Sequence, residues 1–161
     1  NNFSSSLGQK VVSPNLVDKY ADRDVKINPV DNITERQKYY TTIKGFFEEY
    51  RAVGLGDELD IVSTGILTYE SSGNAQVENL ILIADAYAGF SQKVIETETP
   101  ESLKSIHLRI ANSANNIGIS VSNMAKIIND PIVGLAGLSE YQEYSDDLVS
   151  AVEELETIVT Q

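Results

Sequence analysis

The sequence predicts an all-α fold: an elongated antiparallel up-down bundle of four main helices, the first broken near Gly54 and Gly56, with an extended N-terminal arm. Three observations support this fold. Apolar residues recur at helical spacing over most of residues 32–161. Short breaks containing Gly, Pro, Asn or Asp separate the periodic segments. The break before the last helix contains almost no linker, so the last two helices must form an antiparallel hairpin.

Length and composition limit the organisation and the partners of the chain. Its 161 residues suit one helical bundle, residues 32–161, and one arm, residues 1–31. The net charge of −12 opposes binding to nucleic acid backbones and to anionic membranes. The absence of cysteine excludes disulfides, thiolate catalysis and Cys-ligated metal sites. We therefore expect no nucleic acid partner, on account of the net charge. No apolar run approaches the ~20 residues of a membrane helix, so we also expect no membrane insertion.

Residues 1–31 differ in pattern from the rest of the chain. They lack helical periodicity, and Pro14 and Pro29 interrupt them. Val25 and Ile27 alternate as in a strand. We predict that the arm packs through its apolar side chains, on its own bundle or on a second copy. The predicted interface residues of the arm are Val11, Val12, Leu16, Val17, Val25, Ile27 and Val30.

The first half of the bundle has a clear start and a clear break. Asn32 is placed to cap a helix, and Glu35 three residues later completes a box-like arrangement. The stretch 54–57, Gly-Leu-Gly-Asp, changes the phase of the apolar pattern, so we predict a turn or sharp kink there. The stretch 70–75 ends this element, and a further helix is predicted from about residue 75 to residue 95.

Two local signals indicate the starts of the last two helices. Thr99 is a candidate N-cap, with Pro100 at the first helical position and Glu101 in the first turn. Asp130 and Pro131 repeat the same signal. The helix between these signals is rich in small and amide side chains, which permit close approach of backbones. The sequence leaves open whether this face packs within one chain or between two.

His107 is the only histidine of the chain, and it lies on or beside the apolar stripe of its helix. A metal ligand or a general base would need convergent partners, so we interpret His107 as a core histidine that holds a hydrogen bond. Counting back from the turn near residue 130 places it opposite Glu153 and Glu154. The sequence therefore predicts a polar core contact among these three residues.

No motif indicates catalysis or metal binding. The Glu-x-x-His pattern of di-iron bundles is missing, because Lys104 stands three residues before His107. Asp18, Asp22 and Asp24 lack the central Gly and the closing Glu of an EF-hand loop. Phosphate-binding Gly-rich loops and a nucleophile elbow are also missing from the sequence. We predict no enzyme activity, no catalytic residues, no metal and no cofactor.

One stretch resembles a group of known proteins. Pro100, Leu103 and His107, followed by Asp130-Pro131 and Tyr141, form a pattern similar to that of exported helical-bundle proteins of small-genome bacteria. That group has no established activity. The resemblance therefore implies a helical fold and an extracytoplasmic location, and nothing catalytic.

Two functional hypotheses follow. Few Lys residues, abundant Ser, Thr and Asn, and a first residue other than Met are typical of a mature exported protein, so we expect a secreted or cell-surface location. The first hypothesis is a non-enzymatic structural or interaction protein that self-assembles through its arm into an oligomer or surface filament, or binds another cell-surface protein. The second is an extracellular four-helix-bundle sensor domain with a ligand pocket near Asp85, His107 or Arg109.

Overall fold

The computed structural model describes residues 17–54, 56–67 and 73–161, and this part of the chain is mostly helical. Its five α-helices are α2 (Ile33–Arg51), α3 (Glu58–Leu67), α4 (Gly73–Glu96), α5 (Lys104–Met124) and α6 (Pro131–Thr160). Two-residue strands, β1 (Ile27–Asn28) and β2 (Thr99–Pro100), and two 3-10 turns, η1 (Asp22–Asp24) and η2 (Glu101–Leu103), complete the described elements. The prediction of an all-α fold is confirmed.

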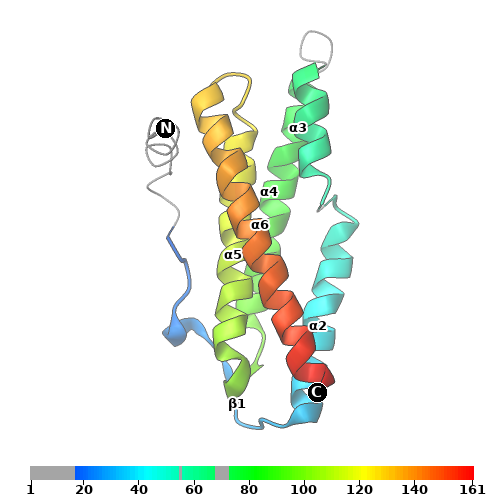
Figure 1. Cartoon of the computed structure of the whole chain (residues 1–161), viewed down its shortest axis with the longest axis vertical. Helices are drawn as coiled ribbons and strands as arrows, with labels where there is room; N and C mark the ends of the chain where they lie inside the picture. Colours follow the sequence, from blue (N-terminus) through cyan, green and yellow to red (C-terminus); the bar gives the residue numbers. More distant parts are fainter. Residues whose placement is uncertain (1–16, 55, 68–72) are drawn as a thin grey trace, which may run out of the picture.

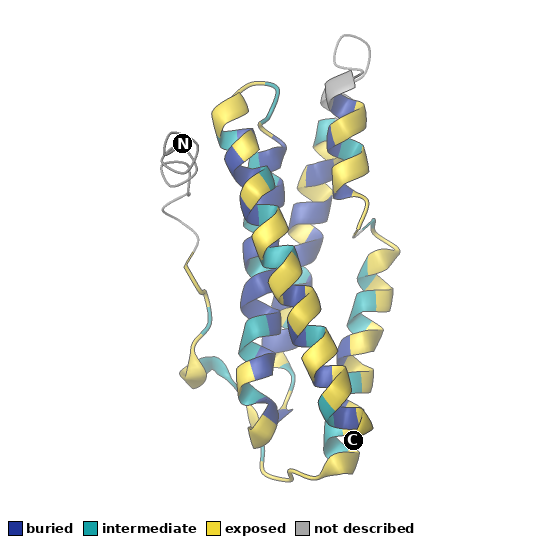
Figure 2. Cartoon of the chain, viewed as in Figure 1, coloured by how far each residue is buried: buried dark blue, intermediate teal, exposed yellow. Residues whose placement is uncertain are grey.

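Helix α5 lies at the centre of the packing. It packs along both α4 and α6, while α3 packs on α4, and α2 contacts α4 and α6. Figure 1 shows α4, α5 and α6 alternating in direction along the long axis, with α2 and α3 following one another beside them. Buried residues are concentrated on α5 and on the sides of α4 and α6 that face it (Figure 2).

The predicted break between the first two helices is confirmed. Gly54 and Gly56 have φ values of +102° and +104°, a conformation that glycine adopts without strain. Helix α2 ends before this turn, at Arg51, and α3 begins after it, at Glu58. The start of α2 also has the predicted cap, because the Asn32 side chain accepts a hydrogen bond from the Glu35 amide at 3.0 Å.

The two predicted starts further along the chain differ in outcome. Asp130 caps α6 by accepting from the Val133 amide at 3.3 Å, with Pro131 as the first helical residue. Thr99 is not a cap, because its hydroxyl contacts the Thr97 carbonyl and the His107 ring instead. Helix α5 therefore begins later than predicted, at Lys104, after the turn η2.

The small side chains of α5 pack within the chain. A Cβ atom added at Gly118 would lie 3.0 Å from the Ala84 carbonyl oxygen of α4. On the other side of α5, a Cβ atom added at Gly137 of α6 would lie 2.7 Å from the Ser120 carbonyl oxygen. Ala111 and Ala114 of α5 are also fully buried. The small-residue face therefore serves contacts of α5 with its own α4 and α6.

The described part of the N-terminal segment lies on its own bundle. Strand β1 pairs with β2 in parallel, with Ile27 opposite Thr99. The main chain of Tyr20 exchanges two hydrogen bonds with the Asn112 side chain of α5, at 2.9 and 3.0 Å. Asp31 accepts from the amide and the hydroxyl of Ser102. These contacts fix residues 20–31 along α5 and the strand that precedes it.

The close contact of α5 with α6 predicts opposite effects for one substitution at two glycines. Gly137→Ala should lower the free energy of unfolding by about 1–3 kcal/mol, because the new methyl group meets main-chain atoms that cannot move aside. Gly45→Ala is the matched control, since nothing lies within 4 Å of its added Cβ. At this exposed position of α2 the substitution should raise the free energy of unfolding by about 0.5–1 kcal/mol. Urea unfolding followed by circular dichroism measures both, and stabilisation by both substitutions would contradict the close packing.

Candidate functional site

A cleft of about 520 Å³ lies between α2 and the three long helices. Helix α2 contributes one wall, from Lys44 to Arg51, and α6 contributes the opposite wall, from Tyr141 to Glu153. Tyr87 of α4 and Ile117 of α5 form part of the lining. The volume lies within the range of roughly 300–1,000 Å³ that is typical of pockets for small organic ligands.

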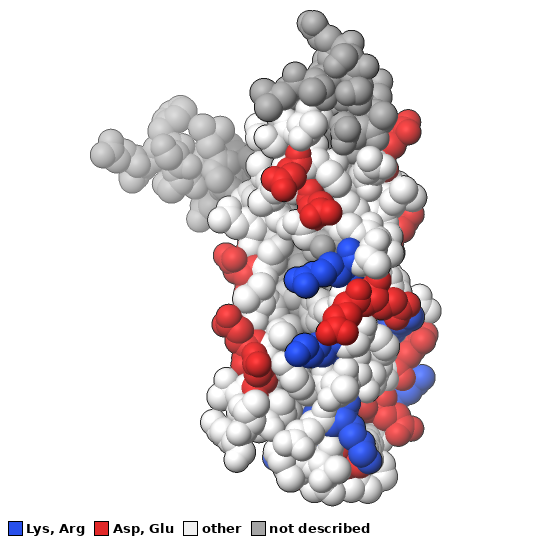
Figure 3. Space-filling model, turned by 90° about the vertical axis from the view of Figure 1, so that its right-hand side faces the viewer, with Lys and Arg blue, Asp and Glu red and all other residues white. Residues whose placement is uncertain are grey.

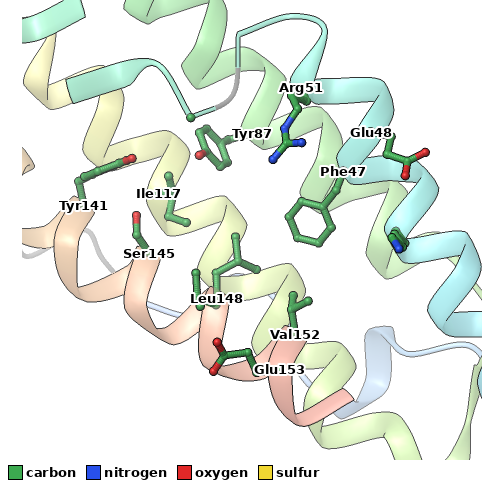
Figure 4. A pocket seen from close by; sticks show the side chains of 13 residues that line it. Phe47, Glu48, Arg51, Tyr87, Ile117, Tyr141, Ser145, Leu148, Val152 and Glu153 are labelled. Atoms are coloured by element: carbon green, nitrogen blue, oxygen red, sulfur yellow. The ribbon is translucent and has the colours of Figure 1, made fainter. Parts of the chain in front are cut away.

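The inner surface of the cleft is mainly apolar. Figure 4 shows Phe47 extending from α2 toward Leu148 and Val152 of α6, with Ile117 of α5 near Tyr87. Phe47 also packs on Phe90 of α4, with ring centroids 4.5 Å apart, and this contact holds its ring in place. The cleft therefore offers an apolar surface whose aromatic wall is fixed by the core.

Charged side chains lie at the rim of the cleft. Glu48 and Glu153 also line the cleft, but in Figure 4 their carboxylates point away from it, whereas the Arg51 side chain extends over the cleft toward Tyr87. Lys44 also lines the cleft, two helical turns before Arg51 on the same face of α2. Figure 3, which faces the α2 side, shows basic side chains in the middle of this surface among acidic ones. At the rim, the Glu48 and Glu153 carboxylates are thus directed away from the cleft, and the Arg51 guanidinium is directed over it.

A buried carboxylate lies behind the end of the cleft near Gly56, where it bonds to two groups of the lining. Glu58, the first residue of α3, is fully buried, and both of its oxygens accept from the Gly56 amide, at 3.0 and 3.1 Å. Tyr141 of α6 donates its hydroxyl to Glu58 at 3.0 Å. Burial raises the pKa of Tyr141 to about 12, and the Glu58 carboxylate adds to that shift. Burial, with a further contribution from Glu58, also raises the pKa of Tyr87, so both phenols stay protonated beside this carboxylate.

The opposite end of α2 is attached through His107, which is fully buried. Its Nδ1 lies 2.7 Å from the Tyr39 hydroxyl of α2 and 2.9 Å from Oγ1 of Thr99. Burial lowers the pKa of His107 to about 4. The main chain of Ile95 partly offsets this lowering of the pKa. Nε2 of His107 has no hydrogen-bond partner among the described residues. His107 is therefore a neutral core residue that joins α2, β2 and α5.

The predicted contact of His107 with Glu153 and Glu154 is not formed. Both glutamates are exposed on α6, and Glu154 pairs with Arg109 instead. Arg109 follows His107 by two residues, which is about 200° around a helix, so the two side chains lie on different sides of α5. Counting residues back from the turn placed this part of α5 correctly opposite Glu154. The side chain that reaches Glu154, however, is that of Arg109 and not that of His107.

The predicted interface residues of the arm have different environments. Val25 is half-buried and packs against the core. Val17, Ile27 and Val30 are 73%, 39% and 50% exposed. The rest of the predicted set, Val11, Val12 and Leu16, lies outside the described residues.

The remaining acidic candidates form no site in the described part of the chain. Asp85 is exposed on α4, and it does not line the cleft. No group of three His, Asp or Glu side chains, those of Asp18, Asp22 and Asp24 included, converges as a metal site within residues 17–54, 56–67 and 73–161. Among the same residues, no helix has both the length and the apolar composition that a membrane span requires.

A second hollow of about 680 Å³ lies between residues 18–22 and the pair α5 and α6. Its polar groups largely bond to one another. Asn112 is bonded to Tyr20, while Asp147 accepts from Ser113 and pairs with Arg109. This hollow is therefore a joint between chain segments, and the apolar cleft is the better candidate for a binding site.

Sequence analysis did not identify the residues of the cleft. Lys44, Phe47 and Arg51 recur at three- and four-residue spacing, which places an aromatic ring between two cations on one face of a helix. That pattern was a usable signal. The burial of Glu58 had no signal, because an acidic residue at the start of a helix is ordinarily exposed and helps to stabilise its N-terminus.

No family model, curated protein or solved structure matches the chain. The cleft and the charges around it are therefore the features from which a function can be inferred.

The buried environment of His107 predicts an unusual titration. Because this is the only histidine, a single imidazole signal in the proton NMR spectrum reports on it. We expect that signal to titrate near pH 4 in the folded protein, compared with an ordinary value of 6.5. Between these values the unfolded chain binds one more proton than the folded chain, so stability falls as the pH drops, by about 3 kcal/mol in total.

The control is His107→Asn, which retains an amide near Nδ1 and does not titrate. Between pH 6.5 and pH 4 its unfolding free energy should decline by about 3 kcal/mol less than that of the wild type. A smaller decline remains in both proteins, because Arg36 and Lys38 lower the pKa values of Asp31 and Glu35, which take up protons as the pH falls. A wild-type imidazole that titrates near 6.5 would contradict the buried, neutral state of His107.

Proposed function

We propose that this chain is a non-enzymatic, extracytoplasmic binding domain that holds a partly apolar ligand in the cleft between α2 and α6. In this proposal α2 and α3 form one interrupted column of an elongated antiparallel up-down bundle, α4, α5 and α6 form the other three columns, and residues 1–31 form an N-terminal arm. The observation that carries the proposal is the cleft itself. It combines a ligand-sized volume, an apolar wall and a small number of oriented polar groups.

The site differs from the pocket that the sensor hypothesis expected. Arg109 and His107 are engaged in other contacts, and Asp85 is exposed. The ligand site is instead formed by the face of α2 that includes Phe47 and by the face of α6 that includes Leu148 and Val152. Binding between the helices of a bundle is a common use of this architecture, which supports the proposal without assigning a ligand.

A neutral fluorescent probe tests whether the cleft binds apolar molecules. N-phenyl-1-naphthylamine should bind with a saturable rise in fluorescence, because the cleft is apolar and accessible. Val152→Phe places a ring into the cleft and should weaken binding at least about tenfold by occupying the same space. The control is Ile132→Phe, a substitution on the same helix at a residue that is 71% exposed and does not line the cleft. Equal affinities for the two variants, or no saturable binding to the wild type, would contradict the proposal.

Self-association through the N-terminal segment is a second candidate function. It is supported by the exposure of Val17, Ile27 and Val30, which leaves apolar side chains available along the described part of that segment. Contacts such as those of Tyr20 and Asp31 hold this part on its own bundle. In this proposal residues 1–16 therefore make the main contacts between copies of the chain.

Deletion of residues 1–16 tests the second candidate without disturbing the contacts of residues 20–31. We expect light scattering to show an assembly for the complete chain and a monomer for the shortened chain. The unfolding curve of the shortened chain should match that of the complete chain measured when dilute. An unchanged mass after the deletion would contradict self-association through this segment.

A further inference from the structure

The geometry points to an anionic amphiphile as the ligand of the cleft: a single carboxylate-like head held by Arg51 and Lys44, with an apolar tail along Phe47, Leu148 and Val152. This inference rests on the proposed binding function and assigns the chemical class of the ligand.

The two cations at the rim, Lys44 and Arg51, have no ion-pair partner among the described residues. The chain contains 24 acidic and 12 basic residues, so acidic side chains are not in short supply. Five of the eleven described Lys and Arg side chains form ion pairs, namely Arg36, Lys38, Lys93, Lys104 and Arg109. Among the six that form none, only Lys44 and Arg51 line the cleft. Lys44 and Arg51 form none with any described residue, although Glu48 lies between them on the same helix.

The charged side chains at the rim of the cleft differ in direction. Arg51 extends over the cleft, and Glu48 and Glu153 point away from it (Figure 4). Lys44 and Arg51 are seven residues apart, which is two helical turns or about 10 Å along α2, so they share one face. Phe47 lies between them on that face. An anion at the mouth would meet positive charge at close range, while the rim carboxylates stay in water.

The buried Glu58 does not reverse this preference. Its carboxylate accepts from the Gly56 amide and the Tyr141 hydroxyl and does not line the cleft. Glu48 and Glu153 also line the cleft, but their carboxylates point away from it (Figure 4), so a cationic head would meet no carboxylate directed into the cleft. Lys44 and Arg51 would repel it at the mouth.

The cleft also has an apolar surface next to the two cations. Phe47 from one wall and Leu148 and Val152 from the other face one another across the cleft, below Arg51 in the view of Figure 4. Burying a methylene group contributes about 0.8 kcal/mol, so an alkyl tail of moderate length supplies affinity while the head supplies orientation. A polar anion without a tail would leave this surface in water.

Isothermal titration calorimetry with three probes of equal chain length tests the inference. Decanoate is the anionic probe, 1-decanol the neutral probe and decyltrimethylammonium the cationic probe, each below its aggregation concentration. Decanoate should bind about tenfold more tightly than decanol, and the cation should bind more weakly than both. Raising the salt concentration should reduce the preference for decanoate, because the rim is accessible to solvent.

Charge-removing variants identify the head-group site. Arg51→Gln and Lys44→Gln should each weaken decanoate binding about fivefold to tenfold and leave decanol binding unchanged. Lys38→Gln is the control, since it removes the same charge from the same helix at a position that is paired with Glu35 and lies outside the cleft. It should affect neither probe.

Each outcome separates the inference from the proposed function. Decanol and decanoate binding equally, or decyltrimethylammonium binding best, would overturn the anionic head while Val152→Phe still blocks the site. Equal effects of Lys38→Gln and Arg51→Gln on decanoate would also overturn it. Failure of all three probes to bind would overturn the proposed function together with the inference.

Discussion

The close approach of α4 and α6 to α5 is the constraint on which the rest of the structure depends. Gly118 and Gly137 permit it, because a side chain at either position would meet main-chain atoms of the neighbouring helix. Three helices packed this closely enclose most of the surface of α5. Helix α2 is then left to pack mainly on α4 and on the edge of α6, and the apolar space beside it is not filled by α5.

Two buried polar attachments hold the α2–α3 column at separate levels. At the start of α2, Tyr39 bonds to His107, and Gln37 donates to the Val159 carbonyl at 3.1 Å. Beyond the end of α2, Glu58 bonds to Tyr141. Buried polar groups are costly when their partners are removed, so each attachment specifies one position for the column. The cleft lies between these levels, where the contacts of α2 with α6 are apolar and incomplete.

Local signals predicted the elements that depend on local physics. The Asn32 cap, the Asp130-Pro131 start and the glycine turn at 54–56 all occur, because neighbouring residues are enough to form them. Thr99 had an equally good local signal, yet its hydroxyl bonds to His107, a partner that only the packing of α5 brings near. The side of α5 that faces α6 was misjudged for the same reason. The cleft could not be predicted, because it is a space left between helices and no single segment specifies it.

The central claim is that the cleft exists before any ligand binds. The absence of cysteine allows spin labels to be attached only where cysteine is introduced, and Glu48 and Glu153 are exposed residues on opposite walls. Pulsed electron spin resonance on the Glu48→Cys, Glu153→Cys double variant then measures the distance from α2 to α6. The structure predicts one narrow distance distribution that stays the same when decanoate is added. A shorter distance in the free protein that lengthens with ligand would show that the cleft is closed when empty and would contradict the account.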